Sequence, residues 1–93
     1  MMKLKNQQTR TDLLNRLRRI EGQVRGVQKM VDEERQCDEI IQQLVSIRSA
    51  VHGATLHFLR EQARECLYPA PGEDPRTQEL NLSELITLLG KIT

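Results

Sequence analysis

The amino-acid sequence predicts an all-α protein. Apolar residues recur at intervals of three and four along two long segments, as on one face of a helix, and no segment alternates as a strand would. The 93 residues allow one domain. With one Phe, one Tyr and no Trp, a large self-contained core is not expected. Small chains of this kind gain stability from metals, disulfides or oligomerisation, and we expect oligomerisation here.

The first predicted helix covers residues 9–32. It opens on Thr9 with Asp12 three positions later, a weak capping pattern. Gly22 and Gly26 lie one turn apart inside it, and each costs about 1 kcal/mol relative to Ala, so we expect another helix to approach closely there. The apolar seam has the spacing 4-3-4-3-4 and consists of Leu13, Leu17, Ile20, Val24, Val27 and Val31.

The second predicted helix covers residues 36–67, after a polar turn at 32–36 that breaks the period. A helix of about 30 residues is about 45 Å long, and two such helices with a short third cannot hide their own seams. We therefore expect a dimer that packs four long helices into a bundle, and a further pairing into a tetramer. The seam of the second helix consists of Ile40, Leu44, Ile47, Val51, Ala54 and Phe58.

A linker is predicted over residues 68–78 and a short third helix over residues 81–92. Three prolines and a glycine fall within residues 69–75, a composition that excludes a helix interior. Asn81, with Glu84 three residues later, forms a capping box. The apolar face of this helix consists of Leu82, Leu85, Ile86, Leu89 and Ile92.

Charge is unevenly distributed. The net charge of the chain is +1, but residues 1–31 carry +6 and the remainder carries −5. A basic segment of this kind indicates a polyanionic partner, although charge alone leaves a solvated helix face open. Two cysteines are too few for a secreted disulfide framework, and no signal peptide or long apolar run is present. We expect a soluble cytoplasmic protein that does not associate with membranes.

The two cysteines, Cys37 and Cys66, lie 29 residues apart on the second predicted helix. That spacing leaves them within roughly 20° of each other on the helix face but about 43 Å apart along its axis. A disulfide needs Cα atoms about 5.5 Å apart, so no bond can join them within one chain. In an antiparallel dimer the Cys37 end of one chain meets the Cys66 end of the other. Two unrelated buried cysteines remain the alternative.

Gln62 is the expected third member of this site. It lies on the same face of the helix, one turn before Cys66. His57 falls about 200° round the helix from Cys37, and His52 lies at mid-helix about 60° from it, so neither readily joins the cysteines. A tight thiolate metal site would normally recruit a histidine or a third cysteine.

The run Arg16-Leu-Arg-Arg-Ile-Glu-Gly-Gln-Val-Arg-Gly26, together with Met30-Val31, the lone Cys37 and Glu65-Cys66, closely resembles the CsoR/RcnR/FrmR family over residues 10–67. This resemblance implies an all-helical repressor that assembles from dimers into tetramers. Such repressors bind operator DNA without a helix-turn-helix and release it on binding copper(I), nickel or cobalt, formaldehyde or sulfane sulfur. In the copper sensors a Cys, a His and a Cys form the site, and these positions map onto Cys37, Gln62 and Cys66.

The residue at the middle position favours reactive sulfur over copper. Gln62 lacks the imidazole of the copper sensors, and a Cys, amide, Cys pattern resembles the persulfide-sensing branch, the CsoR-like sulfurtransferase repressors (CstR). In that branch the two cysteines become bridged by sulfur between subunits. The alternatives are a copper(I)-responsive repressor that uses the thiolates of Cys37 and Cys66, and a helical scaffold that binds no DNA. Otherwise no metal or cofactor is expected.

Phosphate contacts and DNA shape should dominate operator binding, because the chain has no aromatic platform and no recognition-helix motif. By resemblance Arg16 is the foremost candidate, and Gly53 stands where some relatives carry a basic residue. An enzyme is not expected, because no nucleophile triad, phosphate loop or paired-carboxylate cleft is found. The candidate DNA contacts are Arg16, Arg18, Arg19, Arg25, Lys29 and Arg48.

Overall fold

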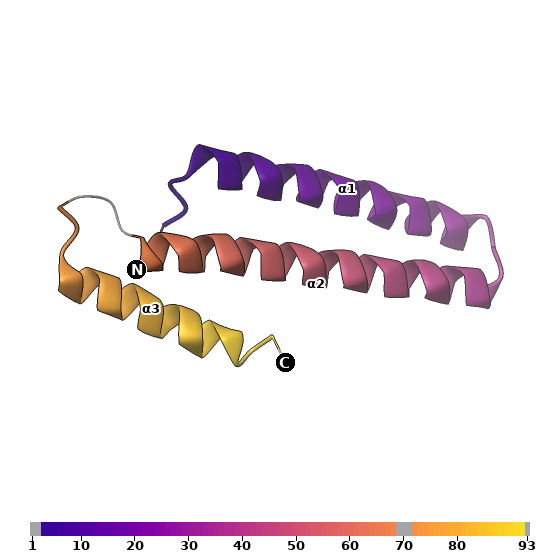
Figure 1. Cartoon of the computed structure of the whole chain (residues 1–93). Helices are drawn as coiled ribbons and strands as arrows, with labels where there is room; N and C mark the ends of the chain where they lie inside the picture. Colours follow the sequence, from indigo (N-terminus) through magenta and orange to yellow (C-terminus); the bar gives the residue numbers. More distant parts are fainter. Residues whose placement is uncertain (1–2, 69–71, 93) are drawn as a thin grey trace.

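The computed structural model describes residues 3–68 and 72–92. Within these ranges it contains three helices and no strand, in the order α1 (Gln7–Asp32), α2 (Cys37–Leu67) and α3 (Pro75–Leu89). The predicted all-α class is therefore confirmed. Figure 1 shows α1 and α2 side by side as an antiparallel hairpin, with α3 along the C-terminal half of α2 on the side away from α1.

α1 begins two residues before the predicted start because Asn6 caps it. The Asn6 side chain accepts a hydrogen bond of 3.0 Å from the backbone N–H of Thr9. The helix ends at Asp32, where the N–H of Glu33 closes onto the carbonyl of Lys29. Glu34 then adopts a φ of 55°, a left-handed conformation that turns the chain toward α2. The capping residue and this turn together set the length of α1.

α2 is a single unbroken helix of 31 residues that packs against α1 along the hairpin. Val27 of α1 and Ala54 of α2 are buried between the helices. Near the open end of the hairpin, Nε2 of His57 lies 4.0 Å from Oδ2 of Asp12. Compared with the predicted helix over residues 36–67, α2 begins one residue later, at Cys37, and ends at the expected residue, Leu67.

The close helix approach expected at Gly22 and Gly26 is not found within the chain. A Cβ atom built on either glycine would meet no other atom within 4 Å. Both glycines are exposed on the single chain.

The predicted start of the third helix is wrong. α3 begins at Pro75, six residues before the expected Asn81, and ends at Leu89 instead of residue 92. Asp74 is the N-cap, and its carboxylate accepts a hydrogen bond of 2.9 Å from the N–H of Arg76. Pro75 is tolerated because the first position of a helix needs no N–H donor. Asn81 lies inside the helix, so the expected capping box with Glu84 is also wrong.

The predicted linker over residues 68–78 therefore ends at Asp74. Residues 69–71 of that linker lie outside the described residues. Gly72 adopts a φ of +88°, which explains a glycine shortly before the α3 cap.

Many apolar side chains remain exposed on the single chain. The molecule measures 57 × 26 × 16 Å, which is too thin to enclose a core. Leu17, Leu44 and Val51 of the two seams are 47%, 51% and 46% exposed. Such surfaces are typical of a chain that packs against copies of itself. Within the described residues, no helix combines the length and the apolar character needed to cross a membrane.

We expect the substitution Asn6→Ala to lower the free energy of unfolding by about 1 kcal/mol, because it removes the cap of α1. Asn6→Ser keeps an oxygen acceptor and should stay close to the parent protein. Urea unfolding at one fixed protein concentration measures both. Equal losses for the two variants would contradict the capping role.

Candidate functional site

The two cysteines lie on one face of α2, which we call the cysteine face. Its residues fall within an arc of about 100° around the unbroken helix. Their positions are symmetric about the point between Val51 and His52. The cysteine face consists of Cys37, Ile41, Leu44, Arg48, Val51, His52, Thr55, Leu59, Gln62 and Cys66.

The length of α2 keeps the two thiols of one chain apart. Cys37 is the first residue of the helix and Cys66 is the second-last, so about 43 Å of helix separates them. Neither cysteine forms a disulfide within the chain. A reaction or a ligand that joins the two sulfurs must therefore use two chains.

Cys37 is open to solvent at the start of α2. Gln36 precedes it as the N-cap and makes no side-chain capping hydrogen bond. Of the two acidic residues that follow, Glu39 accepts a hydrogen bond of 2.9 Å from Nε of Arg35. Cys37 is therefore the cysteine that a dissolved reagent meets first.

Cys66 has the opposite environment. Its side chain is 5% exposed. Burial raises the pKa of the Cys66 thiol above its ordinary value, and the nearby carboxylates of Glu73 and Glu65 raise it further. Each cause disfavours the thiolate, so Cys66 is held mainly as the neutral thiol at physiological pH. The two cysteines therefore differ in access, and only Cys66 has surroundings that raise the pKa of its thiol.

Gln62 is buried one turn before Cys66. It is 3% exposed, and its Nε2 has no hydrogen-bond partner among the described residues. A buried amide without a partner costs about 1–3 kcal/mol, so a residue in this condition is a candidate for contact with something outside the chain. The structure therefore places Gln62 beside Cys66 and leaves Cys37 at the far end of the helix.

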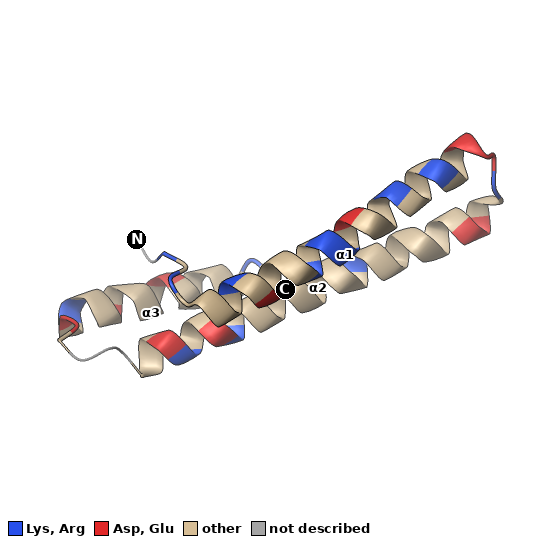
Figure 2. Cartoon of the chain, turned by 90° about the horizontal axis from the view of Figure 1, so that it is seen from above, with Lys and Arg blue, Asp and Glu red and all other residues tan. Residues whose placement is uncertain are grey.

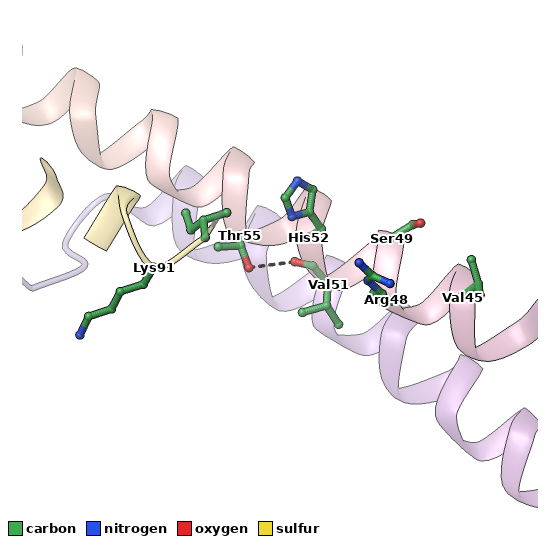
Figure 3. Close-up of a pocket in the computed structure, with 8 residues that line it drawn as sticks. Val45, Arg48, Ser49, Val51, His52, Thr55 and Lys91 are labelled. Atoms are coloured by element: carbon green, nitrogen blue, oxygen red, sulfur yellow. Dashed lines mark hydrogen bonds between the residues drawn. The ribbon is translucent and has the colours of Figure 1, made fainter. Parts of the chain in front are cut away.

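The histidines do not converge on the cysteines. His57 faces Asp12 of α1, and His52 lies at mid-helix beside a groove of about 650 Å³ (Figure 3). Within the described ranges, no group of three or more His, Cys, Asp or Glu side chains is placed to hold a metal ion. A metal at the cysteines would therefore depend on donors from a second chain.

Arg48 borders the same groove and is exposed, on the same side of α2 as the cysteines. Figure 3 shows it next to Ser49, with Lys91 from the segment after α3 at the other end of the groove. Thr55 lies between them and donates a hydrogen bond of 2.9 Å to the carbonyl of Val51. The groove is thus a basic and apolar depression halfway between Cys37 and Cys66.

The basic residues of α1 separate into two groups. Arg16 and Arg19 line a second groove, of about 400 Å³, whose other wall includes Ser49 and Gly53 of α2. Gln23 also lines this groove, and its Oε1 is buried without a partner among the described residues. Ser49 borders both grooves, the one lined by Arg48 and the one lined by Arg16 and Arg19.

The remaining candidates, Arg18, Arg25 and Lys29, are exposed along α1. Figure 2 shows the basic residues spread over this helix and acidic residues at the turn into α2. Arg25 pairs with Glu21 at 3.6 Å, and Lys29 pairs with Glu33 at 3.8 Å. Pairs this exposed are worth little, so these cations stay available to a polyanion.

Sequence reasoning missed Gln78 and Glu73. Nε2 of Gln78 donates a hydrogen bond of 2.7 Å to the backbone carbonyl of Cys66. Glu73 acts on the Cys66 thiol from the end of the linker. Both residues were assigned to the predicted linker. A helix start at Pro75 would have placed Gln78 in the first turn of α3 and Glu73 just before its N-cap.

Comparison with known proteins identifies the class. Residues 9–91 match the family described as metal-sensitive transcriptional repressor. The chain is 36% identical over 89 residues to the copper-sensing transcriptional repressor CsoR of Bacillus subtilis, covering 96% of this chain and 86% of that protein. It is 34% identical over 77 residues to the copper-sensing transcriptional repressor RicR of Mycobacterium tuberculosis, covering 77% and 80%.

A solved structure agrees with these relatives. The copper-sensing repressor CsoR with Cu(I) from Geobacillus thermodenitrificans superposes with a TM-score of 0.79 at 34% identity, covering 97% of this chain and 92% of that chain. The chain therefore belongs to the metal-sensitive transcriptional repressor family, and the resemblance to CsoR, RcnR and FrmR proteins is confirmed at that level. The members that it matches are regulators of transcription and not enzymes.

We expect iodoacetamide to alkylate Cys37 at least about ten-fold faster than Cys66 at neutral pH, because the thiolate is the reactive form and only Cys37 is open. Since the pKa of Cys66 is raised, its rate should go on rising at alkaline pH after that of an ordinary cysteine has levelled off. Peptide mass spectrometry of timed samples measures both rates. In denaturant the rates should converge; equal rates in the folded protein would refute the assignment.

Proposed function

We propose that this chain is an operator-binding repressor whose inducer is reactive sulfur, sensed jointly by Cys37 of one subunit and Cys66 of the partner subunit. The observation that carries the proposal is Gln62, a buried carboxamide at the middle position of the site. An amide is a poor donor to a soft metal ion, but it can hydrogen-bond to a thiolate or a sulfur chain. Because a repressor acts on DNA, we expect the protein to work in the cytoplasm.

The symmetry of the cysteine face supports antiparallel pairing of α2 with a second copy. When the two helices are related about the point between Val51 and His52, cysteine meets cysteine, Leu44 meets Leu59, and no like charges are opposed. The pairs are Cys37 with Cys66, Ile41 with Gln62, Leu44 with Leu59, and Arg48 with Thr55. A homodimer with two equivalent sites results, and pairing of dimers through the remaining exposed seams would give a tetramer.

The chemistry divides between the two cysteines according to their exposure. The Cys37 thiolate attacks a sulfane sulfur of an inorganic polysulfide. A Cys37 S–S bond forms, the attacked S–S bond breaks, and the shortened polysulfide leaves with the electron pair. The partner's Cys66 thiolate then attacks the Cys37 sulfur and expels hydrosulfide. Two thiols are oxidised to one disulfide and one sulfane sulfur is reduced; one thiol proton leaves on the hydrosulfide and the other passes to water.

Copper(I) sensing is the second candidate function, because copper sensors are among the similar proteins. The two thiolates suit copper(I), and they would hold it as a linear pair across the subunits. The middle position does not fit, since Gln62 offers an amide and His52 and His57 lie elsewhere. The donor set therefore accommodates copper(I) only in part.

Operator binding is assigned to the basic surface of α1, with Arg16 and Arg19 at its centre. These side chains share a groove with Gln23, so phosphate oxygens can accept from the guanidinium groups. Joining the cysteines across the subunits changes how the helix ends meet, and DNA affinity falls because DNA and the bridged state favour different arrangements.

Adding inorganic polysulfide and copper(I) separately to the protein–DNA complex tests the inducer. We expect polysulfide to release the DNA, as followed by fluorescence anisotropy, and to produce a crosslinked dimer on non-reducing gels. The single variants Cys37→Ser and Cys66→Ser should retain DNA and form no crosslink between these positions. Release by copper(I) with no response to polysulfide would replace the proposal with the copper alternative.

We expect Arg16→Ala to weaken operator binding roughly ten-fold and to reduce the salt dependence of the affinity, because a phosphate contact is lost. Arg76→Ala removes an exposed arginine from α3 and should leave binding nearly unchanged. Titrations at two salt concentrations measure both. If Arg16→Ala and Arg19→Ala bind like the parent protein, this groove does not contact DNA. A parent protein that binds no operator would be a helical scaffold.

A further inference from the structure

The two halves of the cysteine face are covered differently. In the C-terminal half Gln62 and Cys66 are 3% and 5% exposed, whereas Ile41 and Leu44 in the other half are 58% and 51% exposed. The difference coincides with α3, which packs only along the C-terminal half of α2 (Figure 1). Leu85 of α3 is buried there at 4% exposure. α3 therefore lies on the end of the cysteine face that the partner's Cys37 has to reach.

A specific contact holds α3 in this position. Nε2 of Gln78, in the first turn of α3, donates a hydrogen bond of 2.7 Å to the carbonyl of Cys66. That carbonyl belongs to the last turn of α2, where carbonyl groups lack partners within the helix. Gln78 therefore links the first turn of α3 to the last turn of α2. The Asp74 cap and Pro75 fix where α3 starts, and so determine the position of Gln78 along the helix relative to Cys66.

We propose that α3 is a lid over Cys66 and that Gln78 is the positioning residue that latches it. The inference rests on the proposed function, in which the partner's Cys37 must reach Cys66. While the latch is closed, Cys66 is out of reach. When the lid opens, Cys66 can resolve the sulfur carried by the partner's Cys37, and the new bridge occupies the space that α3 covered. The lid then stays open, so the state of the cysteine is transmitted to α3.

The latch is tested on Cys66 alone, in the variant Cys37→Ser, so that no crosslink can form. Gln78→Met keeps the length of the side chain and removes the donor. We expect it to speed alkylation of Cys66 by N-ethylmaleimide about five-fold, the factor that corresponds to one ordinary hydrogen bond. Gln42→Met, an equal change at an exposed glutamine of α2, should have no effect. Equal rates for the two methionine variants would overturn the proposal.

Hydrogen exchange separates a lid from a general loss of stability. In Cys37→Ser, alkylation of Cys66 should speed the exchange of amides in residues 75–89 at least about five-fold while those in residues 10–32 keep their rates. Gln78→Met should bring the same change without alkylation. Uniform acceleration of all three helices, or none in α3, would refute the lid. If these results hold but polysulfide fails to release DNA, the lid stands and the proposed inducer is wrong.

Discussion

The rise of an α-helix is the constraint on which the rest of this molecule depends. Because each residue advances the helix by about 1.5 Å, the 29 residues between Cys37 and Cys66 become a fixed separation of about 43 Å. The sulfurs share a face but cannot meet within one chain. The hairpin is also too thin to enclose a core, and its apolar seams stay exposed. Such surfaces are typical of a chain that packs against a second copy.

The same separation gives the two cysteines different environments. Cys37 stands at the start of α2, next to a turn that is open to solvent. Cys66 lies where three features of the chain meet: the last turn of α2, the carboxylate of Glu73 and the first turn of α3. Exposure at one end and a protonated, covered thiol at the other suit a two-step reaction in which one cysteine captures and the other resolves.

Sequence patterns predicted α1 and α2 to within two residues, because their seams are long and a polar turn separates them. The start of α3 was not predicted, because Pro75 was treated as a helix breaker although Asp74 before it makes Pro75 a favourable first residue. The face shared by Cys37, Gln62 and Cys66 follows from helical periodicity. The bond from Gln78 to Cys66 does not, because it depends on how two helices pack after an irregular linker.

The symmetry of α2 also has a genetic consequence. Under antiparallel pairing, each site contains Cys37 of one chain and Cys66 of the other, so no site is built from one subunit alone. A cell that makes a chain without Cys37 together with a chain without Cys66 would assemble mixed dimers. Each mixed dimer would contain one complete site and one that lacks both sulfurs, whereas either chain alone would form none. Two defective alleles would then complement each other within a single oligomer.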